Sequence, residues 1–228
     1  MIKLNLVYDK LYKSFGPQGW WPLTIKGNYS KYHSGRPKTD NHKFEIIIGA
    51  FLTQNTNWKN VEKALYNLAK NKLLNIERIN KTKKEKLAQL IRPAGYYNQK
   101  SERLKIIAKF LTKNPIKKLN KLPVKELRKK LLDIKGIGPE TADSIILYVF
   151  EKPIFVIDAY TKRIFSRLGY KAKNYDEWQS LFHKSLKKDL NSFKEYHALI
   201  VELGKNYCKS RPFCESCIIK GICKFCKL

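Results

Sequence analysis

The sequence has no run of roughly 18 apolar residues, the length that a helix needs to cross a bilayer. Its first residues form an amphipathic pattern that includes the acidic Asp9, which is not typical of a secretion signal. Cysteine does not occur before Cys208, so the chain lacks the spread of thiols seen in disulfide-stapled secreted proteins. These absences argue against the secreted and membrane classes. We therefore expect a cytoplasmic protein with no targeting signal and no membrane contact.

Acidic residues are also scarce, with 19 Asp and Glu against 47 Lys and Arg, and the net charge is +28. Such an excess is typical of proteins that bind a polyanion, and nucleic acid is the usual one. A Lys-rich composition that only keeps the protein in solution is the alternative. Arginine is rare among the basic residues, which favours contacts with the phosphate backbone over the reading of base sequence.

The chain of 228 residues is 43% apolar, enough for one large domain or two small ones that share a core. Apolar residues recur at helical spacing at the N-terminus and through most of residues 42–150. Prolines and glycines break the pattern at Pro93, Gly95, Pro115 and Pro123. The apolar segment 154–157 is too short to build a sheet. These patterns predict an all-α fold.

Residues 127–150 predict two helices joined by the turn Lys135-Gly136-Ile137-Gly138-Pro139. Two glycines permit a tight turn with positive φ, and Pro139 suits the first position of the second helix. Such a turn points backbone amides at a bound anion, which on duplex DNA would be a phosphate. An ordinary pair of helices with a glycine-rich turn is the alternative interpretation, and the charge of the chain favours the DNA contact.

All five cysteines lie in the last 21 residues, with the spacing C-x5-C-x2-C-x5-C followed by Cys226. Thiols grouped in this way indicate one metal site rather than a disulfide framework. Four thiolates suffice for zinc or for a 4Fe-4S cluster, so one cysteine is surplus. The spacing alone leaves the two metals open.

Several ordered motifs resemble the helix-hairpin-helix DNA glycosylase superfamily and, within it, the endonuclease III group. They are LTQNT (52–56), AGYYNQKSERL (94–104), LLDIKGIGPETADSIIL (131–147), VIDAYTKRIFSRLG (156–169) and the cysteine loop CKSRPFCESCIIKGIC. The resemblance implies a six-helix barrel domain over 41–152 and a second helical domain formed by 1–40 and 153–228. It also implies that duplex DNA with a damaged base lies in the cleft between the domains. We expect a monomer that is associated with the nucleoid.

The cysteine loop is similar to the 4Fe-4S loop of this family, which favours a cluster over zinc. The resemblance implies as ligands Cys208, Cys214, Cys217 and Cys223. The first interval is five residues long where the family usually has six, and Cys226 is additional. Whether Cys226 joins the ligand set therefore stays open, within a cluster loop that spans 208–226.

Hydrolysis of an N-glycosidic bond passes through a sugar with oxocarbenium character, which a nearby carboxylate stabilises. Asp158 follows the apolar segment 154–157 and precedes a helical pattern, so it is a candidate. Its position is also that of an ordinary helix N-cap. The two roles are compatible, because capping amides hold a carboxylate ionised. The resemblance assigns to Asp158 the place of the family's essential aspartate.

Bifunctional members of the group use a lysine amine to form a Schiff base and cleave the strand, and the matching position here is Glu140. A carboxylate cannot form an imine. The sequence therefore predicts a monofunctional DNA N-glycosylase of base excision repair. The alternatives are a bifunctional endonuclease III-type glycosylase/AP lyase and a DNA-binding module without catalysis. A further alternative is a zinc-binding protein associated with RNA.

The target base must leave the helical stack, so other groups must fill the gap. By resemblance, Gln54 and Tyr96 match positions that wedge into the duplex, and Lys135, Gly136, Ile137 and Gly138 form the DNA-binding turn. A pattern similar to the branch that excises 3-methyladenine implies a base pocket of Trp20, Trp21, Pro22 and Phe44. Aromatic stacking favours positively charged alkylated purines and could also hold uracil. The four histidines show no ligand spacing and receive no role.

Overall fold

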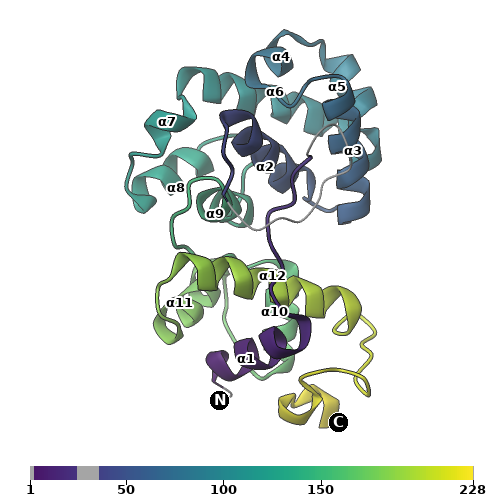
Figure 1. Ribbon diagram of the computed structural model, residues 1–228, viewed down its shortest axis with the longest axis vertical. Coiled ribbons are helices and arrows are strands. Elements are labelled where there is room, and N and C mark those ends of the chain that lie inside the picture. The colour runs from purple at the N-terminus through teal and green to yellow at the C-terminus, as the bar shows by residue number, and fades with distance from the viewer. Residues whose placement is uncertain (1–2, 25–35, 228) are drawn as a thin grey trace. The chain divides into compact units, whose positions relative to one another are not determined.

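The computed structural model describes residues 3–24 and 36–227, and in these ranges the regular structure is helical, with no strand (Figure 1). The prediction of an all-α fold is thus confirmed. None of the described helices is long and apolar enough to cross a membrane.

The chain divides into two compact units, each with its own core. The central unit is Trp21–Phe150, and the terminal unit combines Met1–Trp20 with Glu151–Leu228. The sequence placed the boundaries at residues 41 and 152. In this division the described residues 21–24 belong to the central unit, and the predicted domain boundaries stay a prediction.

The helices of the central unit follow one another through short turns. They are α2 (Asp40–Leu52), α3 (Trp58–Lys70), α4 (Ile76–Lys81), α5 (Lys84–Leu90), η1 (Arg92–Ala94), α6 (Tyr97–Lys113), α7 (Ile116–Leu119), α8 (Val124–Leu132) and α9 (Pro139–Tyr148). Polar caps fix several of their starts. Asn57, for example, accepts the N–H of Asn60 at the start of α3.

Helix α2 forms the centre of this unit (Figure 1). Every residue from Phe44 to Leu52 is buried, so the helix is covered on all sides. It packs against α3 and α9. The apolar segment 44–52 is therefore the central helix of the unit, and α9, which carries one side of the glycine-rich turn, rests directly on it.

The terminal unit joins the two ends of the chain. Its helices are α1 (Leu4–Phe15), α10 (Ala159–Arg167), α11 (Tyr175–Ser185), α12 (Leu190–Asn206), η2 (Lys220–Ile222) and η3 (Phe225–Lys227). Helix α12 packs against α1 and α10. The core is aromatic, with the rings of Phe155 and Phe182 stacked 4.1 Å apart. The hydroxyl of Tyr196 donates to the carbonyl of Leu4 at 2.8 Å and ties the N-terminal helix to α12.

Candidate functional site

The turn between α8 and α9 has the conformation that its glycines allow. Gly136 has a φ of +95°, a region that L side chains rarely adopt. Ile137 is 6% exposed and plugs the space between the two helices, while the side chain of Lys135 is 72% exposed. No side chain caps the start of α9, where Gly138 is the N-cap. The turn therefore combines a buried plug, an exposed cation and a helix N-terminus that can meet an anion.

Two side chains from other elements support this turn. The amide of Gln54 donates to the carbonyl of Gly136 at 3.0 Å and to the hydroxyl of Thr141 at 2.9 Å. The side chain of Arg103, on α6, covers Gly136 so closely that a Cβ at this glycine would overlap it. Gln54, predicted as a wedge, thus contacts the hairpin in this structure. Its role inside a duplex stays a prediction.

A buried ion pair locks the two helices of the hairpin together. Nε of Arg128 on α8 lies 2.8 Å from Oδ1 of Asp143 on α9, and the carboxylate side chain is fully buried. A buried pair with good geometry holds its partners in one register, because breaking it leaves an uncompensated charge. The pair fixes the angle at which the turn is presented.

Tyr96 stands at the tip of the loop between η1 and α6. Tyr96 is 70% exposed, more than any other large hydrophobic residue that the structure describes. Its φ of 45° lies in the left-handed region, directly after Gly95 with a φ of +69°. An exposed ring on a tightly turned loop is available to enter a base stack, and that role of Tyr96 stays a prediction.

The predicted base-pocket residues do not share one environment. Phe44 is fully buried in α2, and Trp21 is 6% exposed, packed edge-on against Tyr148 at 5.2 Å. Pro22 is buried beside it. The buried carboxyl of Glu45 accepts the N–H of Thr24 at 2.6 Å and holds this segment on α2, and burial raises the pKa of that carboxyl. These three predicted residues are core residues of the central unit, and their contact with a base stays a prediction.

Asp158 lies at the start of α10 in the terminal unit, directly after the buried segment 154–157. Its Oδ1 accepts both the N–H and the hydroxyl of Thr161, each at 2.7 Å. Its Oδ2 lies 3.7 Å from Nε2 of His197 on α12. The carboxylate is thus both a helix cap and the partner of a histidine, and 11% of its side chain is exposed.

The environment of Asp158 favours the ionised form. Burial by itself would raise the pKa of this carboxyl, but the side chain of His197 and the two hydrogen bonds from Thr161 outweigh that effect. The pKa of Asp158 therefore lies below its ordinary value of 3.8. A buried carboxylate that stays charged can stabilise a positive charge that develops beside it.

Trp20 is the predicted pocket residue that contacts His197, the partner of this carboxylate, within the terminal unit. Its ring stands edge-on to the ring of His197, with the centroids 5.6 Å apart. The ammonium of Lys205 lies over the indole, 5.6 Å from its centroid. Trp20 is partly exposed. Asp158, His197 and Trp20 therefore form one cluster, which joins a charge, an imidazole and an aromatic face.

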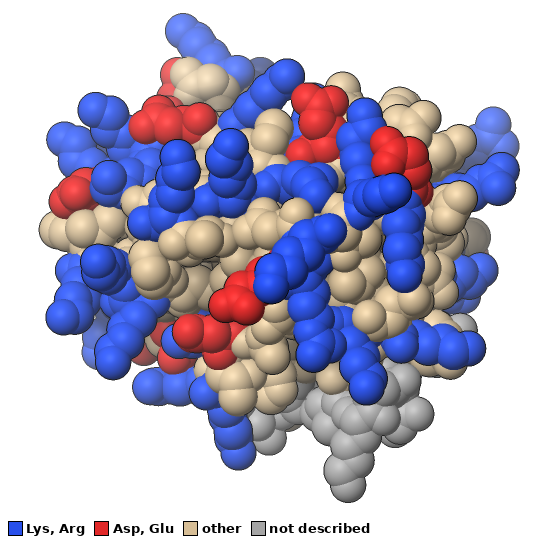
Figure 2. Space-filling model, turned by 90° about the horizontal axis from the view of Figure 1, so that it is seen from above, with Lys and Arg blue, Asp and Glu red and all other residues tan. Residues whose placement is uncertain are grey.

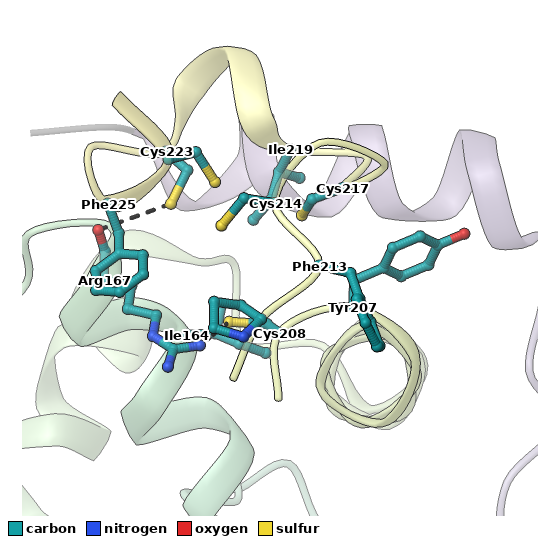
Figure 3. A pocket seen from close by; sticks show the side chains of 12 residues that line it. Ile164, Arg167, Tyr207, Cys208, Phe213, Cys214, Cys217, Ile219, Cys223 and Phe225 are labelled. Carbon is teal, nitrogen blue, oxygen red and sulfur yellow. Dashed lines mark hydrogen bonds between the residues drawn. The ribbon is translucent and has the colours of Figure 1, made fainter. Parts of the chain in front are cut away.

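The five cysteines of the loop 208–226 line one pocket in the terminal unit (Figure 3). The rest of its lining is mostly apolar, and comprises Ile164, Arg167, Tyr207, Pro212, Phe213, Ile219 and Phe225. Burial raises the pKa of Cys217, and its neighbouring thiols add to that effect. Burial and the hydrogen bonds with Cys214 and Cys223 raise the pKa of Cys226 to about 12. Thiols gathered in an apolar pocket need a cation to become thiolates.

Two arginines of α10 hold this cysteine loop. Nη1 of Arg167 donates to the sulfur of Cys208 at 3.1 Å and to the carbonyl of Lys209 at 2.7 Å. Nε of Arg163 donates to the carbonyl of Cys208 at 2.7 Å. Cysteine thiols are the donor type that a multi-thiolate cofactor uses, but the described side chains in this structure are not placed around a common centre. Among the described residues, no group of three or more His, Cys, Asp or Glu side chains is arranged so that it could hold a metal ion.

Basic side chains cover much of the surface. Figure 2 shows Lys and Arg over most of one face, with only scattered Asp and Glu. Glu140, in the first turn of α9, is exposed. The surface charge is the physical form of the net charge of +28, and it suits a long polyanion.

Sequence reasoning missed His197 and Lys100. His197 lies in a run of apolar residues on α12 and is buried. A histidine within such an apolar run was the only signal that the sequence offered for it. Lys100 is 3% exposed, at a position where an amphipathic helix places an apolar residue. Neither contact could be predicted from spacing, because the partners lie on other elements.

Residues 48–188 match the family model described as the HhH-GPD superfamily base excision DNA repair protein. The chain is 45% identical to a Methanocaldococcus jannaschii protein that is provisionally named as a DNA repair glycosylase, and the match covers 97% of each chain. It is 33% identical to endonuclease III of Thermotoga maritima over 81% of this chain and 86% of that one.

Two solved structures illustrate the likeness in three dimensions. The 3-methyladenine DNA glycosylase of H. pylori, bound to 1,N6-ethenoadenine, is 28% identical with a TM-score of 0.69, over 90% of this chain and 98% of that one. Endonuclease III in a non-covalent DNA complex has a TM-score of 0.79 at 21% identity, over 100% of this chain and 98% of that one. The second likeness shows the shared fold.

Proposed function

Because the chain belongs to the HhH-GPD superfamily of base excision DNA repair proteins and is an endonuclease III-like DNA glycosylase, we propose that it is monofunctional. In this proposal it hydrolyses the N-glycosidic bond of a flipped alkylated purine such as 3-methyladenine, or of uracil, and leaves the strand intact. The observation that carries the proposal is the geometry of Asp158, a charged and buried carboxylate held by Thr161 and His197.

Asp158 would act on the sugar through its second oxygen. Oδ1 is occupied by the N–H and hydroxyl of Thr161, so Oδ2, which lies 3.7 Å from Nε2 of His197, is the oxygen that would face the reacting C1′. As the base leaves, the sugar gains positive charge, and the nearby carboxylate lowers the energy of that state. The same carboxylate can orient the attacking water. Thr161 and His197 keep it ionised and in place, so they are positioning residues.

The absence of a strand-cleavage step rests on Glu140. By resemblance this position holds the lysine nucleophile of bifunctional members, and a carboxylate cannot form an imine with the sugar. Here Glu140 lies exposed in the first turn of α9, where an acidic side chain is favourable for the helix dipole. We therefore expect an abasic site with both phosphates still attached.

A preference for alkylated purines is supported by the indole of Trp20, which stands edge-on to His197, the partner of Asp158, and already holds one cation, the ammonium of Lys205, over its ring. An electron-rich ring stacks well on a positively charged base. The similar protein from H. pylori is a 3-methyladenine DNA glycosylase. Uracil is the second candidate base, since a flat aromatic surface also accepts a pyrimidine.

We assign to the cysteine loop a structural 4Fe-4S cluster on Cys208, Cys214, Cys217 and Cys223, with zinc as the alternative. The five thiols line one pocket, and Arg167 donates to the sulfur of Cys208. The cluster would cross-link the loop. Iron and sulfide in equal amounts, with visible absorbance, support the assignment, and a colourless zinc protein contradicts it.

The proposal is tested by base release from labelled duplexes that contain 3-methyladenine, uracil or thymine glycol, each with and without alkali. We expect cleavage only after alkali, and the reactive duplex identifies the base. Asp158→Asn should lower base release by about 100-fold or more and leave DNA affinity intact.

Asp189→Asn is the matched control, because Asp189 caps α12 by accepting the N–H of Ser192 at 2.7 Å and has no part in the proposed chemistry. It should retain base release. Nicking without alkali would contradict the monofunctional proposal. Full activity of Asp158→Asn would contradict the role of Asp158, and binding without base release from any duplex would favour a non-catalytic DNA-binding module.

A further inference from the structure

Lys100 is a buried cation in the first turn of α6, with 3% of its surface exposed. Its ammonium lies 2.9 Å from each of four oxygens, which are the carbonyls of Leu52, Gln54 and Ala94 and the hydroxyl of Thr56. None of these partners is a carboxylate. The positive charge is therefore balanced by backbone dipoles that converge on one point.

The four oxygens come from two segments that are distant in sequence. Leu52, Gln54 and Thr56 belong to the end of α2 and the loop after it, whereas Ala94 ends η1. The hydroxyl of Thr56 also donates to the carbonyl of Ala94, so the two segments meet directly beside the ammonium. Removing the charge would take one donor from each of these oxygens, and the carbonyls of Gln54 and Ala94 would then accept only from the hydroxyl of Thr56 among the side chains described.

The arrangement costs free energy, since burial lowers the pKa of Lys100 to about 8. Lys105, on the same helix, shows a more ordinary arrangement. It is half-buried, and its ammonium donates to the carbonyls of Asn80 and Thr82 at 3.0 and 2.5 Å. A lysine at the edge of the fold can therefore join loops without full burial, and the burial of Lys100 calls for another reason.

The two segments that Lys100 joins carry the residues expected to enter the duplex. Gln54 supplies one of the bound carbonyls, and its side chain contacts the hairpin at Gly136. Tyr96 follows Ala94 by two residues and points outward from the loop, 70% exposed. The ammonium of Lys100 therefore bonds Gln54 itself and a carbonyl that lies two residues before Tyr96.

We infer that Lys100 is a positioning residue for base flipping, whose ammonium fixes the spacing between the loops of Gln54 and Tyr96 so that both enter the gap together. The inference rests on the proposed function, which requires a flipped base, and on the wedge roles that the resemblance predicts for these two residues. On this inference Lys100, whose side chain is buried, controls how well Gln54 and Tyr96 fill the gap that the flipped base leaves.

The test uses Lys100→Met, which keeps an unbranched side chain and removes the charge, with Lys105→Met as the matched control. The probe is a duplex with 2-aminopurine opposite a tetrahydrofuran abasic-site analogue, whose fluorescence rises when the stack opens. We expect the wild type and Lys105→Met to give the same rise. Lys100→Met should need about tenfold more protein for it, while affinity for undamaged duplex stays unchanged.

A double-mutant cycle with Tyr96→Ala separates positioning from general destabilisation. If Lys100 acts through the Tyr96 loop, the loss caused by Lys100→Met should largely disappear in the Tyr96→Ala background. Equal losses in both backgrounds would overturn the inference, as would an unchanged response of Lys100→Met. If circular dichroism shows that Lys100→Met does not fold, Thr56→Val removes one partner of the ammonium and should give a smaller loss of the same kind.

The same series distinguishes this inference from the proposed activity. A wild type that opens the abasic duplex but releases no base from any substrate would contradict the glycosylase proposal alone. A wild type that gives no fluorescence change on the abasic duplex would overturn the inference, even if base release is observed.

Discussion

At the scale of single residues, the two oxygens of Asp158 have separate partners. Oδ1 caps α10 through Thr161, and Oδ2 faces His197. The cap could be predicted from the sequence, because a cap depends on neighbours along the chain. His197 could not, since its contact with Asp158 depends on how α10 and α12 pack. Local patterns thus identify the reacting group, and tertiary packing supplies the group that tunes it.

The contact with His197 leads to a pH-dependent prediction. His197→Gln removes an interaction that lowers the pKa of Asp158, so that pKa should rise. Base release needs the carboxylate ionised, and the acid limb of its pH–rate profile should therefore move to higher pH. The profile is measured on the reactive duplex, and an unmoved acid limb would contradict this role of His197.

The free energy of unfolding should also depend on the ionisation of Asp158. In the folded state the pKa of Asp158 lies below its ordinary value of 3.8. The ionised carboxylate therefore stabilises the fold at pH values above 3.8, and this contribution is lost as the pH falls through the lowered pKa. Urea unfolding at neutral and acidic pH should show a smaller loss of stability on acidification for Asp158→Asn than for the wild type.

At the scale of elements, helix α10 connects the two functional parts of the terminal unit. Asp158 caps its start, and Arg167 in its last turn holds the cysteine loop. The helix itself could be predicted from its periodicity. Its close approach to α12 could not, because it depends on Gly204 of α12, which accommodates the ring of Tyr160 where a Cβ would overlap it.

Gly204→Ala should therefore move α10 away from α12 and disturb the pairing of Asp158 with His197. We expect a loss of stability of about 1–3 kcal/mol, typical of overpacking, together with slower base release. Thermal unfolding and base release measure the two effects. Gly221→Ala is the control, because a Cβ at Gly221 meets nothing within 4 Å. Equal behaviour of the two variants would show that the close approach is unimportant.

At the scale of the whole molecule, the net charge predicts the kind of partner, whereas the ordered motifs predict the family and the fold. The net charge of +28 could be read from composition, and it predicts a polyanionic partner without saying where contact occurs. The ordered motifs predicted the family and the all-α fold, because each combines residue types with fixed spacing. The environment of Trp21 could not be predicted, since aromatic residues near a terminus serve cores as readily as binding sites.

Binding to undamaged DNA should weaken steeply as salt is added, since phosphate contacts release counterions. Lys135→Gln should reduce the slope of log affinity against log salt by about 1 and weaken all sequences alike, because Lys135 is exposed on the hairpin turn. Fluorescence anisotropy on two duplexes of unrelated sequence measures both. An unchanged slope, or a loss confined to one sequence, would argue against a phosphate contact at the turn.

Tyr96 has a backbone conformation that lowers the stability of the unbound protein. A side chain at a φ of 45° strains the backbone by about 1–2 kcal/mol, which a glycine would relieve at an entropic cost of about 1 kcal/mol. The ring adds little packing to offset this, since Tyr96 is 70% exposed. In the unbound molecule a glycine would serve as well or better. The tyrosine is thus a feature that selection for folding alone would have no reason to keep.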